Sequence, residues 1–318
     1  MRLRSVLPLG AAGAVGLLLA GCGAASTAGE PSDAGAAQVL ASFYPLQYVA
    51  EQVGGDLVEV SSLTPPGAEP HDVELSPRQV RAVDETDLVL YLSGFQSAVD
   101  EAIEARDPAL VLDAADLTDL VEEHEDEHEG EGEAHAAEDD AVDHDHAGVD
   151  PHFWLDPQLL AALAQPVAEA LTEVDPDHAA EFADGAARLG AELAELDDAY
   201  ATGLAACERR VLVTSHRAFG YLTRAYDLEQ VGISGLDPEA EPSPARLREI
   251  GDVVRAEGVT TVFTETLVSP RAAQTLADDL SVTTAVLDPV ESLTEPASDY
   301  RTVMEQNLTA LRSGLGCA

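Results

Sequence analysis

Lysine is missing from this sequence: all 16 basic residues are arginine, against 60 acidic residues, which gives a formal net charge of −44. A chain so short of positive charge has no electrostatic affinity for phosphates, so we exclude nucleic acid as a partner. The same imbalance attracts cations into any cleft of the fold. Thirteen of the acids lie in residues 122–145, and most of the others fit solvated acidic faces of surface helices.

An apolar run long enough to cross a membrane is also missing. The stretch Leu7–Ala20 has about fourteen residues, too few for a comfortable transmembrane helix, and is typical of a secretory signal. It runs into Leu-Ala-Gly-Cys, which resembles the lipobox of bacterial lipoproteins. The resemblance implies a signal peptide at 1–22 and an acylated Cys22 that anchors an extracytoplasmic protein to the cell membrane. An ordinary signal peptide with a chance cysteine is the alternative. We expect residues 23–36 to form a flexible tether.

Cysteine is scarce, because Cys22 is accompanied only by Cys207 and Cys317. A pair of cysteines in an exported protein predicts a structural disulfide. The bond would close a loop of about 110 residues, which chain-entropy models credit with several kcal/mol. Two free thiols are the alternative. Neither cysteine belongs to a CxxC sequence, which argues against a redox role.

Strand and helix patterns alternate through both ends of the chain. In the first part, apolar runs predict strands at 39–44, 58–63, 88–92 and 110–112. Helical spacing follows the first of these runs at 45–53, and Ser76-Pro77 has the N-cap and proline of a helix start. The last part repeats the alternation, with strands at 211–214, 231–233, 261–264 and 284–287 and helices at 217–227, 243–257, 270–279 and 298–314. Strands separated by such helices indicate parallel α/β sheets.

The middle of the chain is helical. Asp156-Pro157 starts a helix that we expect to reach residue 174, and the amphipathic stretch 177–206 predicts one helix of about 45 Å. We therefore predict an α/β protein of two lobes, each a parallel sheet flanked by helices, joined by a single long rigid α-helix. The lobes are 37–156 and 207–318, with the helical region 157–206 between them. Because the long helix contains no proline, we expect metal binding to cause small local changes rather than a wide closure.

A low-complexity segment at 121–149 consists mainly of Glu, Asp, His, Ala and Gly. It lacks the apolar residues to order itself, so we expect a disordered loop inside the first lobe. The segment contains five histidines, which are expected to bind metal weakly as an auxiliary site: His124, His128, His135, His144 and His146. A solubilising acidic spacer with incidental histidines is the alternative.

Only four histidines lie outside that segment. His71 follows the second strand, His216 follows the first strand of the second lobe, and His152 lies at the entrance to the helical region. Asp288 follows the last strand. Ligands of open α/β sheets bind at the carboxyl ends of strands, so these four side chains could converge in the cleft between the lobes. Each one alone could equally be a capping or turn residue. The fourth histidine, His178, is expected to be a surface residue.

Three imidazoles and one carboxylate suit zinc, which takes four such ligands in a tetrahedron. Manganese prefers a shell richer in oxygen. The composition of the predicted site therefore favours Zn2+ as the ligand over Mn2+ or iron.

Three motifs carry a resemblance to one family: GAEPHD at 67–72, DPHFWLDP at 150–157 and TSHRAFGY at 214–221. They resemble the metal-site motifs of the ZnuA/TroA solute-binding proteins of bacterial zinc and manganese ABC importers, and the resemblance covers nearly the whole mature chain. It implies metal ligands at His71, His152, His216 and Asp288. Manganese-type members usually carry Glu at the third position, so His216 favours zinc. Some zinc-type members have an acid before the first histidine, where this chain has Pro70, so water remains an alternative to Asp288.

The leading hypothesis is a monomeric, non-enzymatic binding protein that captures Zn2+ outside the cytoplasm and delivers it to the permease of an ABC importer. A manganese or iron homologue of the same type is the nearest alternative. A zinc hydrolase would need an open coordination position and a general base, for which Glu265 is the candidate. A surface adhesin or metal buffer is the remaining alternative.

Overall fold

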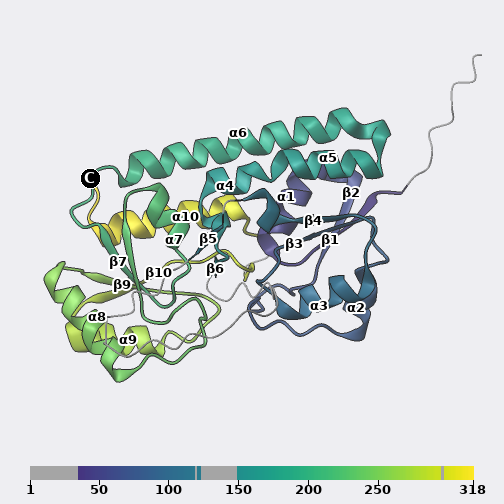
Figure 1. Ribbon diagram of the computed structural model, residues 1–318. Helices are drawn as coiled ribbons and strands as arrows, with labels where there is room; N and C mark the ends of the chain where they lie inside the picture. Colours follow the sequence, from purple (N-terminus) through teal and green to yellow (C-terminus); the bar gives the residue numbers. More distant parts are fainter. Residues whose placement is uncertain (1–34, 119, 123–148, 295–296) are drawn as a thin grey trace, which may run out of the picture. The chain divides into compact units, whose positions relative to one another are not determined.

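The computed structural model describes residues 35–118, 120–122, 149–294 and 297–318 (Figure 1). Residues 36–318 form one compact unit. The predicted signal peptide with Cys22, nearly all of the tether and the five histidines of the low-complexity segment lie outside the described residues. Antiparallel strands β5 (Val121–Glu122) and β6 (Val149–Asp150) flank that segment.

The first sheet has four parallel strands in the order β2-β1-β3-β4. They are β1 (Ala37–Ala41), β2 (Val58–Ser62), β3 (Leu88–Tyr91) and β4 (Val111–Asp113). Successive side chains of a strand point to opposite faces. Val39 accordingly packs in the core that α1 (Tyr44–Gly54) covers, whereas Leu40 packs with α2 (Pro77–Ala82) and α3 (Ser97–Arg106) on the other face.

The second sheet is also parallel, in the order β10-β9-β7-β8. Its strands are β7 (Val211–Thr214), β8 (Glu229–Gly232), β9 (Thr261–Thr264) and β10 (Thr283–Val286). Its helices are α7 (Gly220–Ala225), α8 (Pro244–Ala256), α9 (Arg271–Leu280) and α10 (Tyr300–Leu315). Side chains of α8 and α9 enclose one core with Val213, while Leu212 and Phe263 belong to the core that contains α10.

The helical middle consists of α4 (Pro157–Ala162), α5 (Ala164–Val174) and α6 (Ala179–Leu204). The helix expected at 157–174 is divided at Leu163, and a short 3-10 turn at Pro176–His178 precedes the 26-residue α6. Helix α6 contacts α1, α4, α5 and α10 (Figure 1), and α4 and α10 both bond its residues near 195–200. At Gly185 a Cβ atom would lie 2.1 Å from the backbone oxygen of Val53, so α6 packs directly against the end of α1.

The fold class is confirmed: two parallel four-stranded sheets flanked by helices, with one long helix that contacts helices associated with both. The predicted disulfide is confirmed as well, because Cys207 is bonded to Cys317. Among the residues described, no helix has both the length and the apolar character needed to cross a membrane.

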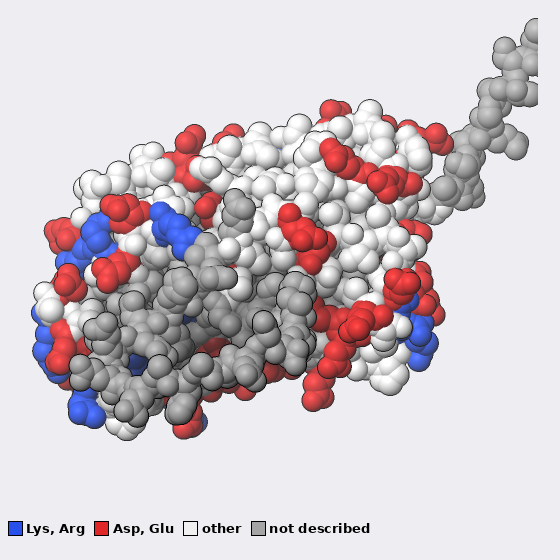
Figure 2. All heavy atoms as spheres, viewed as in Figure 1, with Lys and Arg blue, Asp and Glu red and all other residues white. Residues whose placement is uncertain are grey.

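The surface carries its acidic side chains over both parts of the fold. Figure 2 shows Asp and Glu scattered across the described face, with the fewer arginines beside them. Several of these arginines pair locally, as Arg106 does with Asp84 and Arg246 with Glu249. Exposed pairs of this kind contribute little to stability, about 0–1 kcal/mol each. On the face that Figure 2 shows, the described acidic side chains lie at the solvated surface.

Candidate metal centre

Four loops bring side chains to one point. His216 lies two residues after β7, and His71 lies in the loop after β2. His152 lies two residues after β6 and is the N-cap of the 3-10 turn Phe153–Leu155. The loop after β10 contributes Glu291. Parallel strands present their carboxyl ends at one edge of a sheet, so both sheets direct loops to this point.

The ligand atoms of these four residues lie within 4.8 Å of one another. The Oε1 atom of Glu291 lies 3.1 Å from His152 Nε2, 3.3 Å from His71 Nε2 and 3.6 Å from His216 Nε2. The Nε2 atoms of His152 and His216 are 3.4 Å apart. Four ligands placed 2.0–2.1 Å from a tetrahedral Zn2+ would lie about 3.3 Å from one another. These four distances are close to the edges of such a tetrahedron, and the remaining ones are no longer than 4.8 Å.

Two of the histidines are held by carboxylates behind them. Asp150 Oδ1 lies 2.7 Å from His152 Nδ1 and accepts a hydrogen bond from the His152 backbone N–H at 3.0 Å. Glu265 holds His216 in the same way, at 2.5 Å from Nδ1 and 3.0 Å from the backbone nitrogen. A carboxylate on Nδ1 orients the ring and leaves Nε2 free for a metal. Both Nε2 atoms accordingly face the centre of the group.

His71 is held differently. Its loop contains neither helix nor strand between β2 and α2, and its side chain is 15% exposed, whereas His152 and His216 are buried. Glu69 accepts a hydrogen bond from the backbone N–H of His71 at 3.1 Å rather than contacting Nδ1. The ring packs edge-on against Phe95. The third histidine therefore depends on its loop for its position.

Burial and hydrogen bonding shift the pKa values of the group in opposite directions. Burial raises the pKa of Glu291, but hydrogen bonds from His152, His216 and His71 outweigh it and hold the pKa well below its usual range. Burial lowers the pKa of His216, yet Glu265 and Glu291 raise it to about 10. The pKa of His152 is also raised, since Asp150 and Glu291 outweigh its burial. Without metal, the group is a buried carboxylate paired with protonated imidazole.

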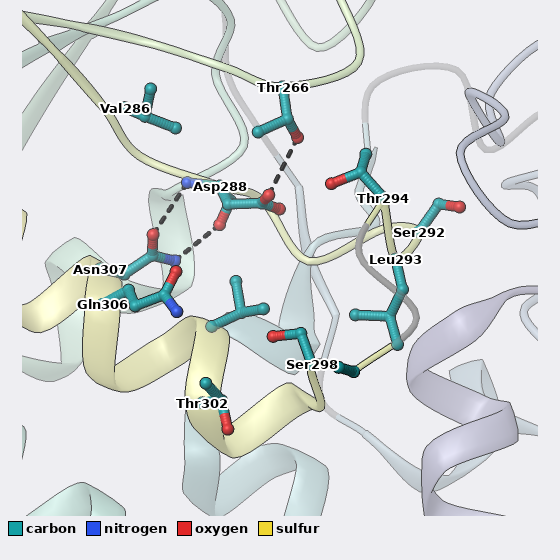
Figure 3. A pocket seen from close by; sticks show the side chains of 12 residues that line it. Thr266, Val286, Asp288, Ser292, Leu293, Thr294, Ser298, Thr302, Gln306 and Asn307 are labelled. Carbon is teal, nitrogen blue, oxygen red and sulfur yellow. Dashed lines mark hydrogen bonds between the residues drawn. The ribbon is translucent and has the colours of Figure 1, made fainter.

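Asp288 does not belong to the group of acid and histidine side chains that the described residues bring together. Its Oδ1 accepts a hydrogen bond from the backbone N–H of Val290 at 2.8 Å, and its Oδ2 accepts one from Thr266 Oγ1 at 2.9 Å (Figure 3). The fourth member is Glu291, three residues further along. The structure thus places Glu291, rather than the expected Asp288, beside the three histidines, and the Asp288 carboxylate is engaged within its own loop.

The reason for the difference lies in the backbone of Val290, which has φ 57°. A β-branched residue with positive φ is an outlier that sequence patterns do not reveal. The turn redirects the chain after Pro289 and directs Glu291 toward the histidines. Glu291 could have been considered from the sequence, because it follows the same strand as Asp288.

Glu265, the candidate base of a hydrolase, is buried and engaged with both the ring and the backbone of His216.

The role of Asp150 was not predicted from the sequence, although an acid two residues before a candidate histidine was a usable signal. His178, expected at the surface, has a 42% exposed side chain and pairs with Asp175.

The fold and this group define a class: two-sheet α/β proteins whose loops bring together three imidazoles and a carboxylate that could hold a small cation. Residues 39–314 match the family ZnuA, described as "Zinc-uptake complex component A periplasmic". The chain belongs to the ZnuA family, as the sequence motifs suggested. It is a family of solute-binding transport proteins rather than enzymes.

Three similar proteins illustrate the relationship. The high-affinity zinc uptake system protein ZnuA of Bacillus subtilis is 32% identical over 94% of each chain. The zinc-binding lipoprotein AdcA of Streptococcus pneumoniae is 34% identical over 87% of this chain, which spans only 56% of the length of AdcA. The solved structure of the laminin-binding protein Lmb of Streptococcus agalactiae, described as bifunctional with adhesin and metal transporting activity, has a TM-score of 0.75 at 30% identity, covering 88% of this chain and 99% of that one.

Proposed function

We infer that this protein captures Zn2+ outside the cytoplasm and supplies it to a membrane ABC importer. The observation that carries the inference is the buried group of three imidazoles and a carboxylate, spaced for tetrahedral zinc, in a member of the ZnuA family. Two of its relatives are named for zinc uptake and zinc binding. The nitrogen-rich ligand set favours zinc over manganese. Zinc is the transported cargo of this protein.

We propose that the ligands are Nε2 of His71, His152 and His216 and a carboxylate oxygen of Glu291. Their mutual distances and the two bracing carboxylates support the assignment. Four protein ligands would complete the coordination of Zn2+, which leaves no position for the water that a zinc hydrolase requires. The division into lobes at 37–156 and 207–318, with the cation between them, is part of the same proposal.

We also propose that acylated Cys22 anchors the protein on the outer face of the cell membrane. The proposal is supported by the Leu-Ala-Gly-Cys sequence and by the name of the relative AdcA, a lipoprotein. The partner in the membrane would be the permease of the importer, and the binding protein would act as a monomer. Metabolic labelling with a palmitate analogue should mark the wild-type protein and leave Cys22→Ala unlabelled.

We propose that the histidines of the segment 121–149 bind further zinc weakly, because its sequence lacks the apolar residues that would order it and each binding event would have to order the chain. We expect a deletion of residues 122–146 to remove weak sites from a calorimetric titration with zinc while the tight site remains. If the deletion abolished tight binding, the site formed by His71, His152, His216 and Glu291 would have to be abandoned.

Native mass spectrometry with elemental analysis tests the main proposal. The purified protein lacking residues 122–146 should carry one zinc ion, lose it to a strong chelator and regain it from a solution that contains excess manganese. The variant His152→Ala with His216→Ala should carry none. His178→Ala is the matched control, since this exposed histidine lies outside the group, and it should bind like the parent.

An adhesin is the second candidate, because the similar protein Lmb is described as having adhesin as well as metal transporting activity. It does not compete with zinc capture. Surface-plasmon measurements on immobilised laminin would test it, with the zinc-loaded protein as analyte.

A further inference from the structure

The loop that carries Glu291 is held by the only asparagine of the sequence, Asn307. Asn307 lies in α10 and is 2% exposed. Its Oδ1 accepts a hydrogen bond from the backbone N–H of Asp288 at 2.8 Å, and its Nδ2 donates one to the backbone oxygen of Asp288 at 2.6 Å (Figure 3). One amide side chain thus satisfies both backbone groups of the residue at the start of the turn.

The turn Asp288–Val290 has an unfavourable backbone conformation, and each of its three residues takes part in a hydrogen bond that holds it. Asp288 accepts hydrogen bonds from Thr266 Oγ1 and from the N–H of Val290, whose positive φ is unfavourable for a β-branched side chain. The backbone oxygen of Pro289 accepts a hydrogen bond from Trp154 Nε1 at 2.7 Å. Such a conformation persists only where its surroundings fix it. Here polar side chains fix it.

On one side, the turn at residues 288–290 is not held by packed side chains. A cavity of about 530 Å³ borders it, and Asp288, Asn307 and Thr266 are among the residues that line the cavity (Figure 3). Side chains on the border of a cavity lack neighbours that could hold the turn by contact. The hydrogen bonds of Asn307 and Asp288 are therefore its main restraint on this side.

We propose that Asn307 and Asp288 are positioning residues that hold Glu291 at the three histidines and thereby set the affinity for zinc. The proposal rests on the proposed function of the site. Neither residue needs to touch the cation. Partners behind metal ligands typically contribute 10–100-fold to metal affinity, because they remove the need to order the ligand during binding.

The test measures zinc affinity by competition with a chelating dye. Asn307→Ala and Asp288→Ala should each weaken binding by about 10–100-fold. Asp288→Asn should bind within about threefold of wild type, because its amide oxygen can still accept from Val290 and its amide nitrogen can donate to Thr266. A similar loss for Asp288→Asn and Asp288→Ala would identify Asp288 as a charged ligand and overturn the proposal.

A double-mutant cycle distinguishes positioning from general stabilisation. In a Glu291→Gln background, Asn307→Ala should weaken zinc binding by less than about threefold, because the carboxylate it positions is already gone. An undiminished effect in that background would contradict the proposal. Tyr200→Phe is the matched control: it also removes a buried side-chain hydrogen bond to the backbone of α10, at Met304, and should leave zinc affinity unchanged.

The same variants distinguish a failure of the ligand assignment of Glu291 from a failure of the positioning role of Asn307 and Asp288. If Glu291→Gln itself bound zinc like wild type, the ligand assignment would be wrong. If Glu291→Gln weakened binding but Asn307→Ala did not, the ligand assignment would be supported and the positioning role of Asn307 would be wrong. Should Asn307→Ala not fold, the Asp288→Ala and Asp288→Asn pair decides by the same criterion.

Discussion

The two buried histidines of the centre and the partly buried His71 differ in what holds them. His152 and His216 each have a carboxylate that binds both the ring and the backbone, and both are buried. His71 lies on an irregular loop, and its carboxylate partner Glu69 bonds its backbone instead of its Nδ1. That loop touches the Glu291 loop through the hydrogen bond from Gly67 N to Ser292 Oγ, at 2.8 Å.

From this difference we expect His152 and His216 to set the affinity for zinc, and His71 to control the access of zinc to the site. Ligands that are already oriented lose little freedom when the metal binds, so His152 and His216 should contribute most of the binding free energy. A ligand on a loop can move aside and return, which gives the cation a way in and out of a site whose other members are buried. We therefore expect the two kinds of histidine to respond differently to mutation, pH and metal.

The largest effect should come from removing the histidines themselves. His152→Ala and His216→Ala should each weaken zinc binding by more than about a hundredfold, since a direct ligand is worth at least as much as its outer partners. His71→Ala should weaken zinc binding by only about tenfold, because the entropy lost in ordering the loop offsets part of the free energy that His71 contributes. Competition titrations with a chelating dye would measure this, with His178→Ala as the control.

Equal losses for all three variants would contradict the division between held and mobile ligands. Wild-type affinity in all three would remove the site as a whole.

The bracing carboxylates should come next. Asp150→Ala and Glu265→Ala are expected to weaken zinc binding by about 10–100-fold through misoriented rings. Glu69→Ala should cost less than about threefold, since Glu69 does not contact the Nδ1 of its histidine. Asp175→Ala is a suitable control. Asp175 contacts His178 Nδ1 at 2.6 Å, as Asp150 contacts the Nδ1 of His152, but His178 does not belong to the group. A larger loss for Glu69→Ala than for Asp150→Ala would reverse the comparison.

The pH dependence of binding should also reflect the buried pair. The pKa of His216 is raised to about 10, so a proton occupies this ring in the metal-free protein near neutral pH. The pKa of His152 is raised in the same direction. Zinc needs the neutral ring and must displace its proton. Affinity should therefore rise with pH, by about tenfold per pH unit for each proton displaced, until pH reaches the folded pKa.

Calorimetric titrations in buffers with different ionisation enthalpies would count the protons released. The number should fall in His216→Ala. An affinity that does not change between about pH 6.5 and pH 8 would be inconsistent with protonated rings in the metal-free site.

The smallest effect should be the change of shape. Zinc is expected to slow hydrogen exchange in residues 65–74 more than in residues 150–155, because only the first segment is loosely held. The radius of gyration from scattering should change by less than about 1 Å, as for other pre-organised binding sites. Both measurements should use the variant lacking residues 122–146. A change of several Å would show that the connection through α6 bends, contrary to our expectation.

Much of the fold could be predicted because its signals are local. Ser76 and Ser243 begin α2 and α8 as N-caps followed by proline, and both accept the capping hydrogen bond. Apolar runs located all eight strands of the two sheets to within about three residues. Helix α3 was missed, since its first residues follow Gln96 without a capping side chain and its apolar periodicity is weak.

The site could be predicted where chemistry alone was sufficient. Histidines are rare outside the low-complexity segment, so His71, His152 and His216 were the natural candidates, and the fold brings them together. The sequence could not show that Glu291 rather than Asp288 lies beside the histidines, because their placement depends on the backbone turn at Val290. Roles that depend on long-range contacts, such as those of Asp150 and Asn307, require the coordinates.

The bond between Cys207 and Cys317 has a practical consequence for anyone who handles this protein. With a separation of 110 residues, it turns the whole second sheet and its helices into a covalent ring. A protease that cuts one peptide bond inside the ring changes the mass only by one water and releases no fragment. A band of full size on a non-reducing gel is therefore no proof of an intact chain, and only reduction would reveal where the ring had been opened.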